Sequence, residues 1–427
     1  MKLEIRNLAK IIEADIEIDG ITVIAGDNNT GKSTVGKTLD AVFNSTVNIE
    51  EKMRQARINL LSERIYSIIR QSEYSTRLFS RHTIQRLAKE IIEYKSDNTG
   101  EIFRDFCRHC LEDSSEQVVD ELVNELLEQV AQIQNISQEQ LSQNIYTNYF
   151  NEVFNENVNS IFSDYSAEIV LEVKGEQIYL EFLKNKCVRT RRNIKLVNSS
   201  LYIDDSFVLD ELNQQDGIGG FRLSNMNISR RNICKKLSSS SKEDIEEQAL
   251  KQLIVNNRLE NIIELINEVA PGEVIKQQHY MYRAADNYNA PLNLNSLSTG
   301  LKSFVILKQL LLNDQLKEKD VIVLDEPEIH LHPEWQMKYA EIIVCLQKEF
   351  DFSIIVTTHS SHFMEALELY SKKYGISDKS HYYLARNYEN GTRFEDVTEN
   401  TGIIYKEMVE PSLSLDILRE ELYLDND

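Results

Sequence analysis

The chain has 427 residues, more than an ordinary single domain needs, and we expect a core domain that carries a large insertion. Lys and Arg number 47 against 69 Asp and Glu, which gives a formal net charge of -22, so the surface as a whole repels polyanions and any contact with nucleic acid must be local. Five scattered cysteines exclude a secreted disulfide framework, and the sequence contains no leader-like apolar start and no apolar run of roughly 18 residues. We therefore expect a cytoplasmic protein that makes no contact with a membrane.

Three short strands are predicted at the start of the chain, at residues 3–8, 14–19 and 21–26, from their β-branched residues and the turn at Asp19-Gly20. A helix is predicted over 33–43, and the pattern is mostly helical from 48 to 163. Within it, Val119, Leu122, Leu126, Val130 and Ile133 recur at spacings of three and four, which predicts one buried helix face.

Farther along, the period becomes that of strands between about 168 and 209, where a hairpin turns at Lys174-Gly175. Residues 213–242, with Gly217, Gly219, Gly220 and the serines 238–241, are typical of a mobile loop. A further helix is predicted over 243–270, and α/β character returns from about 285.

The segment Gly26 to Ser33, GDNNTGKS, fits the P-loop pattern GxxxxGK[ST] between a predicted strand and a predicted helix. Its two glycines permit the backbone turns that aim N–H groups at a phosphate, and the helix N-terminus adds a favourable field. Lys32 is expected to reach the β- and γ-phosphates of ATP, and the Ser33 hydroxyl is expected to ligate Mg²⁺. The predicted nucleotide-binding residues of this segment are Gly26, Asn28, Asn29, Gly31, Lys32, Ser33 and Thr34.

Two further strand ends carry the remaining chemistry of phosphate hydrolysis. The segment 320–326, DVIVLDE, is predicted to be a buried strand with an apolar run that ends in Asp325 and Glu326, where the first carboxylate is expected to hold Mg²⁺ and the second to act as general base on the attacking water. A third apolar strand, 353–358, is followed by His359, which can hydrogen-bond the γ-phosphate because ligands bind at the carboxyl ends of strands in open α/β sheets.

These motifs, in this order, resemble the ABC-type ATPase superfamily, which includes SMC, RecF-like and OLD-like proteins. Residues 297–303, LSTGLKS, look like the LSGGE-type signature of that superfamily, which implies that Ser298 and Gly300 contact the γ-phosphate held by the other subunit. The sequence departs from the pattern at Thr299, where glycine is usual, and at Leu301, where Glu or Gln is usual. The resemblance implies a homodimer, or a higher oligomer of dimers, that sandwiches Mg-ATP.

Residues 325–333, DEPEIHLHP, resemble the hallmark of the OLD-like branch that includes the AAA-21 and AAA-15 families. His330 and His332 are expected at the subunit interface rather than at a metal. The resemblance implies a switch ATPase of anti-phage defence, as in Septu, PARIS or retron-associated systems, acting on a separate nuclease encoded nearby. OLD-like nucleases append a TOPRIM domain after the ATPase, but only 68 residues follow His359 here, so we expect that this chain is not itself a nuclease.

The predicted fold class is α/β, a P-loop ABC-type ATPase head with a large, mostly helical insertion that contains a small β element. The predicted boundaries are 1–46 for the N-terminal part of the head, 47–284 for the insertion and 285–427 for the C-terminal part.

Two weaker signals leave alternatives open. Cys107 and Cys110 form a CxxC pair that would suit a zinc shared between subunits, as in zinc-hook repair ATPases, but long heptad arms are missing and ordinary helix residues are favoured. The basic runs 184–195 and 222–236 can contact nucleic-acid phosphates or can be solvated faces that pair with acids of the chain.

Three functions therefore compete. The first is the defence switch described above, and its alternative is a RecF- or SMC-like ATPase that clamps DNA during repair. The third, the ATPase subunit of a transporter, is disfavoured by the DEPEIHLHP segment and by the about 260 residues between Ser33 and the signature.

Overall fold

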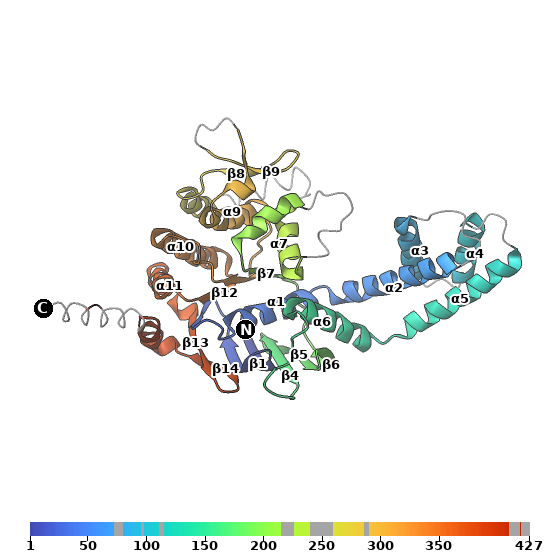
Figure 1. Cartoon of the computed structure of the whole chain (residues 1–427), viewed down its shortest axis with the longest axis horizontal. Coiled ribbons are helices and arrows are strands. Elements are labelled where there is room, and N and C mark those ends of the chain that lie inside the picture. Colours follow the sequence, from blue (N-terminus) through green and yellow to red (C-terminus); the bar gives the residue numbers. More distant parts are fainter. Residues whose placement is uncertain are drawn as a thin grey trace. The chain divides into compact units, whose positions relative to one another are not determined.

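The computed structural model describes residues 1–71, 80–94, 98–110, 115–214, 226–239, 259–285, 290–409 and 419. It divides into two compact units, one formed by residues 1–47 with 149–427 and the other by 48–148. The first unit contains every predicted nucleotide-site residue, and the second is helical (Figure 1).

A mixed sheet of 11 strands forms the frame of the first unit, in the order β6-β5-β4-β1-β2-β14-β13-β3-β12-β11-β7. Five neighbours, β13, β3, β12, β11 and β7, run parallel, whereas β2, β1, β4, β5 and β6 form an antiparallel meander. The strands are β1 Lys2–Leu8, β2 Ile11–Glu17, β3 Ile21–Gly26, β4 Ala167–Val173, β5 Glu176–Leu183, β6 Lys186–Arg192, β7 Ser200–Ile203, β11 Val321–Asp325, β12 Ser353–Thr358, β13 Ser380–Tyr388 and β14 Gly391–Asp396.

Helices cover the parallel half of this sheet. Along β11, Ile322 and Leu324 belong to the same apolar cluster as residues of α9, α10 and α11, whereas Val323 lies beside Gly36 of α1. Because side chains alternate between the faces of a strand, the parallel strands are buried on both sides, which explains their continuous apolar sequences. The labelled helices of this unit are α1 Lys32–Thr46, α7 Ile228–Ser238, α9 Thr299–Leu312, α10 Pro333–Phe350 and α11 Ser361–Tyr374, with 3-10 turns at Ser206–Gln214, Leu294–Ser296, Ser377–Lys379 and Thr398–Asn400. Residues 259–267 and 402–409 are also helical.

A second, three-stranded antiparallel sheet lies before the signature segment, in the order β10-β9-β8. Its strands are β8 Glu273–Lys276, β9 Tyr280–Arg283 and β10 Leu292–Asn293. Tyr280 and Tyr282 pack with residues of α9 in the main apolar cluster, so this small sheet supports the signature helix.

The second unit is built from α2 Ile49–Gln71, α3 Arg81–Tyr94, α4 Thr99–Cys110, α5 Glu116–Asn135 and the first part of α6 Gln138–Phe154. On α5 the predicted buried face is confirmed at Val119, Leu126, Val130 and Ile133. Val123 is buried where the spacing had predicted Leu122, which is half-buried against the same core.

The structure differs from the predicted insertion of 47–284 in two places. The compact helical unit ends at residue 148, and the β element 167–192 joins the main sheet because β4 pairs with β1. Residues 228–238 of the predicted loop form α7, while 215–225 and 240–258 lie outside the described residues, as does most of the predicted helix 243–270, which is helical over 259–267.

Candidate nucleotide site

The P-loop joins β3 to α1, and its backbone conformation depends on three residues with positive φ angles. These are Gly26 at 144°, Asn29 at 62° and Gly31 at 76°, the last of which caps α1 in the left-handed region. Asparagine is the non-glycine residue that tolerates this region best, so the sequence suits the loop. The first-turn N–H groups of α1 therefore point out of the helix toward the loop, as a phosphate site requires.

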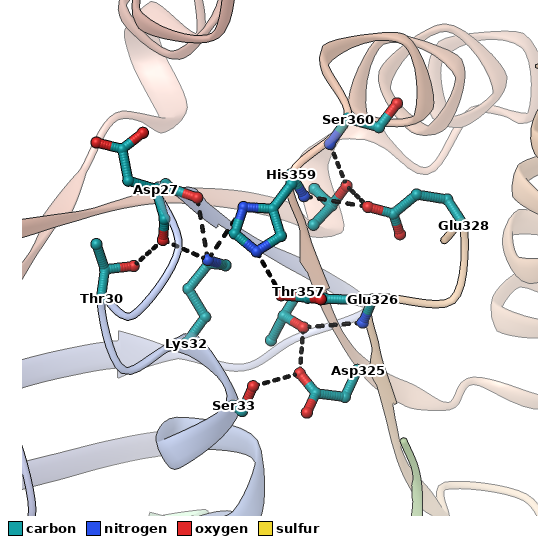
Figure 2. Close-up of polar contacts among 12 residues, drawn as sticks. Asp27, Thr30, Lys32, Ser33, Asp325, Glu326, Glu328, Thr357, His359 and Ser360 are labelled. Atoms are coloured by element: carbon teal, nitrogen blue, oxygen red, sulfur yellow. Dashed lines mark hydrogen bonds and ion pairs between the residues drawn. The ribbon is translucent and has the colours of Figure 1, made fainter. Parts of the chain in front are cut away.

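Lys32 lies inside this loop and is only 3% exposed. Its Nζ donates to the carbonyl oxygens of Gly26 at 3.0 Å and Asp27 at 2.8 Å (Figure 2). Burial lowers the pKa of Lys32 from its ordinary value, and the neighbouring carboxylates of Glu326 and Asp325 oppose that shift. The loop thus holds one ammonium group at its centre.

Asp325 ends β11 beside the first turn of α1, and three hydroxyl groups hold its carboxylate. Oδ1 accepts from Ser33 at 2.9 Å and from Thr357 at 2.5 Å, and Oδ2 accepts from the Tyr202 hydroxyl at 2.5 Å. Burial, followed by the charge of Asp325, raises the pKa of Tyr202 well above its ordinary value, so this phenol remains a donor.

Glu326 follows directly and carries a positive φ of 51°. Its N–H donates to the carbonyl oxygen of Thr357 at 3.1 Å and to the Thr357 hydroxyl at 3.1 Å, which stabilises this uncommon backbone conformation. The turn directs the Glu326 carboxylate away from Asp325 and onto the imidazole of His359 (Figure 2).

His359 connects the general-base candidate with the P-loop. Its Nε2 contacts Oε1 of Glu326, and its Nδ1 lies 3.4 Å from Nζ of Lys32. An ammonium group can only donate, so Nδ1 faces it as the acceptor and the ring proton lies on Nε2, toward the carboxylate. The structure thus brings Lys32, Glu326 and His359 together from three strand ends.

Glu328, which the sequence reasoning did not assign to the site, holds the backbone of His359. The side chain is 4% exposed, and its Oε1 accepts from the Thr358 hydroxyl at 2.5 Å and from the His359 N–H at 3.1 Å. In the part of the chain that the structure describes, the buried Oε2 has no hydrogen-bond partner. Burial, with a contribution from Glu326, raises the pKa of Glu328.

The signature segment contacts the loop that follows β11 in its own chain rather than the P-loop. Ser298 caps α9 by accepting from the N–H of Leu301 at 3.4 Å and is exposed. Gly300 is buried, and a Cβ at that position would lie 2.9 Å from the His330 carbonyl oxygen and 3.2 Å from the Trp335 ring. Among the described residues, the Ser298 hydroxyl accepts from its own helix and Gly300 lies against His330 and Trp335, not against residues 26–34.

Below the P-loop, α1 buries a carboxyl group that the sequence reasoning missed. Asp40 accepts from Asn44 at 2.7 Å, from the Ser200 hydroxyl at 2.7 Å and from the Ser229 hydroxyl at 2.8 Å. Burial raises its pKa to about 6 despite these hydrogen bonds. This group ties the P-loop helix to β7 and α7.

The two basic runs have different environments. In 222–236, Arg230 forms ion pairs with Asp204, Asp205 and Glu211, and Arg231 pairs with Glu152. The charges of these two arginines are therefore neutralised by carboxylates of the same chain. Arg222 lies outside the described residues. The cations of 184–195 are exposed and are considered below.

The other weak signals concern cysteine and histidine residues. Cys107 is buried in the core of the helical unit, and the side chain of Cys110, its partner in the CxxC pair, lies outside the described residues. The described residues hold no cluster of three or more His, Cys, Asp or Glu placed to bind a metal. His330 and His332 are exposed, and His330 stacks edge-on with Phe207 at 6.2 Å. None of the helices in the described ranges is long and apolar enough to cross a membrane.

The arrangement fits ATP and Mg²⁺ by the chemistry of its donors. Ser33 and Asp325 offer the hydroxyl and carboxylate oxygens that Mg²⁺ prefers, already within hydrogen-bond distance of each other. The positive-φ loop, the first turn of α1 and Lys32 offer the N–H groups and the charge that phosphates require.

Comparison with known proteins identifies the family of the chain. A family model described as AAA ATPase domain, AAA_15, matches residues 1–364. The chain belongs to the AAA_15 ATPase family. This ATPase is also similar in fold to solved Smc head domains. One is a head bound to the C-winged helix domain of ScpA, with 11% identity over 92% of this chain and 97% of that chain and a TM-score of 0.43. The others are a head from Thermotoga maritima (13% identity, 93% of this chain, 98% of that chain, TM-score 0.39) and a head with an extended coiled coil bound to the C-terminal domain of ScpA derived from Pyrococcus furiosus (10% identity, 96% of this chain, 98% of that chain, TM-score 0.41).

Proposed function

We propose that this AAA_15 ATPase binds and hydrolyses Mg-ATP between two copies of the chain, and that the cycle holds and releases a separate effector protein. The convergence of Lys32, Asp325, Glu326 and His359 carries the hydrolytic part of the proposal. Bound Mg-ATP supplies the phosphoanhydride bond and the charge neutralisation for phosphoryl transfer. Glu326 takes a proton from water at its carboxylate, and His359 holds that carboxylate in place.

The sandwich between two copies rests on the position of the signature residues. Ser298 is exposed at the start of α9, where its hydroxyl caps its own helix, so it is available to another molecule. A second copy would place the Ser298 hydroxyl and the N-terminus of α9 against the γ-phosphate held by Lys32 of the first.

Complementation between two inactive chains tests the sandwich. Lys32→Ala removes one half of a composite site and Ser298→Arg the other, so each variant alone should lack ATPase activity. A mixture should recover part of it, because one of the two sites in a mixed dimer keeps both native halves. No recovery in dimers shown to be mixed would contradict the sandwich, and a Ser296→Arg chain, altered at an exposed serine next to the signature, is the control.

We further propose that the effector is a nuclease and that the pair acts in anti-phage defence. The support is the resemblance of DEPEIHLHP to the OLD-like ATPases, together with the net charge of -22, which favours docking of a basic partner. Two heads that close on ATP form a two-state element whose population the nucleotide shifts.

The test of the effector is purification of the chain from its native operon with ATP present, where a neighbouring gene product should co-purify and cells with both genes should resist some phages. A chain that purifies alone, gives no protection and complements a DNA-repair defect would favour the RecF- or SMC-like alternative.

A further inference from the structure

The turn between β5 and β6, with β6 itself, is a basic surface on an acidic protein. Residues 182–203 contain six Lys or Arg and neither Asp nor Glu, whereas 69 of the 427 residues of the whole chain are acidic. All six cations are exposed: Lys184, Lys186, Arg189, Arg191, Arg192 and Lys195. The chain as a whole repels polyanions, so this stretch concentrates an opposite local charge.

The position of β6 in the sheet makes this surface accessible. It is the terminal strand of the 11-stranded order, paired with β5 on one side, and Figure 1 shows it at the end of the meander of β1, β4 and β5. Arg189 and Arg191 lie opposite Glu181 and Tyr179 of β5, and Arg189 forms an ion pair with Glu181 at 3.3 Å. Lys186, Arg189 and Arg191 lie opposite Leu183, Glu181 and Tyr179, so these three side chains share one face of the sheet, whereas Arg192 lies opposite Ile178 on the other face.

An exposed apolar loop is fixed beside these cations. Residues 155–166 precede β4, and within them Ile161, Phe162 and Tyr165 are 75%, 44% and 73% exposed. Asn159 and Asn185 bind this loop to the β5–β6 turn. Asn185 Oδ1 accepts from the Asn159 N–H at 3.0 Å, while Asn159 Oδ1 accepts from the Asn185 N–H at 2.8 Å.

Additional hydrogen bonds make this connection firm. Asn159 Nδ2 also donates to the carbonyl oxygen of Phe182 at 2.9 Å, and Asn185 Nδ2 donates to that of Glu156 at 2.5 Å. The aromatic loop and the basic turn therefore form one surface, which we call the aromatic-basic surface: residues 161–165 together with 184–192.

We propose that the aromatic-basic surface binds single-stranded nucleic acid. Cations along the strand would neutralise phosphates, and the exposed rings of Phe162 and Tyr165 would stack on unpaired bases, a combination that recurs in proteins that bind single strands. In a duplex the bases already stack on each other, so the two rings would find no partner. An acidic protein would also satisfy the cations, but a single strand presents a phosphate and an unpaired base at every nucleotide, which matches cations and exposed rings on one surface, so the observations favour the nucleic acid.

The experiment measures fluorescence anisotropy of labelled oligothymidylate and oligouridylate of about 20 nucleotides, longer than a site of ~4–16 nucleotides. A duplex of the same length is the comparison, and all titrations use the full chain without nucleotide over a range of salt concentrations. Binding measured in this way does not depend on the ATPase cycle proposed above. Binding of either oligonucleotide supports the proposal.

Two variants separate charge from stacking. Lys184→Gln with Lys186→Gln and Arg191→Gln should weaken binding at least 10-fold and reduce the salt slope by about 2, since each phosphate contact on a single strand contributes ~0.7. Phe162→Ala with Tyr165→Ala should weaken binding about 10-fold or more while the salt slope is unchanged, because stacking releases no counterions.

A matched control replaces three exposed lysines elsewhere, Lys174→Gln in the turn before β5, Lys319→Gln and Lys406→Gln, and should bind like the native chain. All variants should keep the native unfolding temperature and ATPase rate. The proposal fails if neither oligonucleotide binds, if the variants bind like the control, or if the duplex binds as tightly as the single strands. It also fails if the surface instead retains an acidic protein that the charge variant loses.

Discussion

Replacement of Glu328 tests whether this buried carboxyl group positions His359. In Glu328→Ala, the Thr358 hydroxyl and the His359 N–H lose their acceptor inside the protein. A buried polar group left without a partner costs about 1–3 kcal/mol, so two such groups set an expected loss of about 2–6 kcal/mol in the free energy of unfolding.

Glu328→Gln separates the hydrogen bonds from the charge. The amide oxygen can still accept both hydrogen bonds of Oε1, while the amide nitrogen takes the place of Oε2, which has no partner among the described residues. One unsatisfied donor costs about 1–3 kcal/mol, and removal of a buried charge offsets part of it. We expect the glutamine variant to lie within about 2 kcal/mol of the native chain.

The pH dependence has a definite sign. Because burial raises the pKa of Glu328 above its ordinary 4.5, ionisation is harder in the folded chain than in the unfolded chain. The contribution of Glu328 to the free energy of unfolding is complete below its ordinary pKa, and it is lost as the pH rises toward the pKa of Glu328 in the folded chain. Glu328→Gln cannot titrate, so its stability relative to the native chain should improve as the pH rises.

The assay combines urea unfolding with steady-state ATPase rates for the native chain, both Glu328 variants and Glu334→Ala, a control at an exposed glutamate in the first turn of α10. Loss of the His359 position should lower the turnover of Glu328→Ala on the order of 10–100-fold, while Glu328→Gln stays near the native rate. If Glu328→Ala matches the control in both stability and turnover, or if alanine and glutamine are equally damaging, the positioning role is refuted.

Four other substitutions test the remaining parts of the site. Lys32→Ala should weaken ATP binding in a calorimetric titration by about tenfold or more, because it removes the cation inside the P-loop, and unchanged affinity would contradict the assignment. Glu326→Gln should lower turnover by roughly 10²–10⁴-fold while ATP still binds, and a normal rate would mean that another group activates the water. Gly300→Ala should lower the free energy of unfolding, measured in urea, by about 1–3 kcal/mol, since its Cβ would lie 2.9 Å from the His330 carbonyl oxygen. Native stability would show that the loop after β11 moves aside without cost. Between pH 5 and 8 the free energy of unfolding of the native chain should fall by about 1 kcal/mol, because burial raises the pKa of Asp40 to about 6; Asp40→Asn should abolish this fall, and an identical pH profile in both chains would refute that cause.

The parts of the site predicted from sequence are those set by local pattern. The strand, glycine-containing turn and helix around Lys32 follow one another without a gap, and the apolar strands before Asp325 and His359 are short, continuous and β-branched. Parallel strands bring their carboxyl ends to one edge of the sheet, so the topology brings these three residues together once the strands are identified.

The parts that were missed depend on partners far away in the chain. The alternation of 167–192 predicts strands but does not name β1 as their neighbour, and so the β element was assigned to the insertion. The polar residues of 228–238 resembled a loop, but Ser229 is satisfied by the buried Asp40 carboxyl group and Arg230 by three acids. No sequence pattern marks Tyr202 as a site residue, because its hydroxyl reaches Asp325 only where β7 pairs with β11.

The loop that follows β11 links the base candidate to the signature helix within one chain. Glu326 begins this loop and contacts His359, and the His330 carbonyl near its end lies against Gly300 at the start of α9. Glu328, between them, fixes the loop to the His359 backbone. A movement of Glu326 and His359 that follows the state of the nucleotide would therefore shift the α9 N-terminus, which by the proposed sandwich serves the site of the other copy. The nucleotide state of each chain would thereby change the position of the α9 N-terminus that it offers to its partner, and a pair of heads would close or open together.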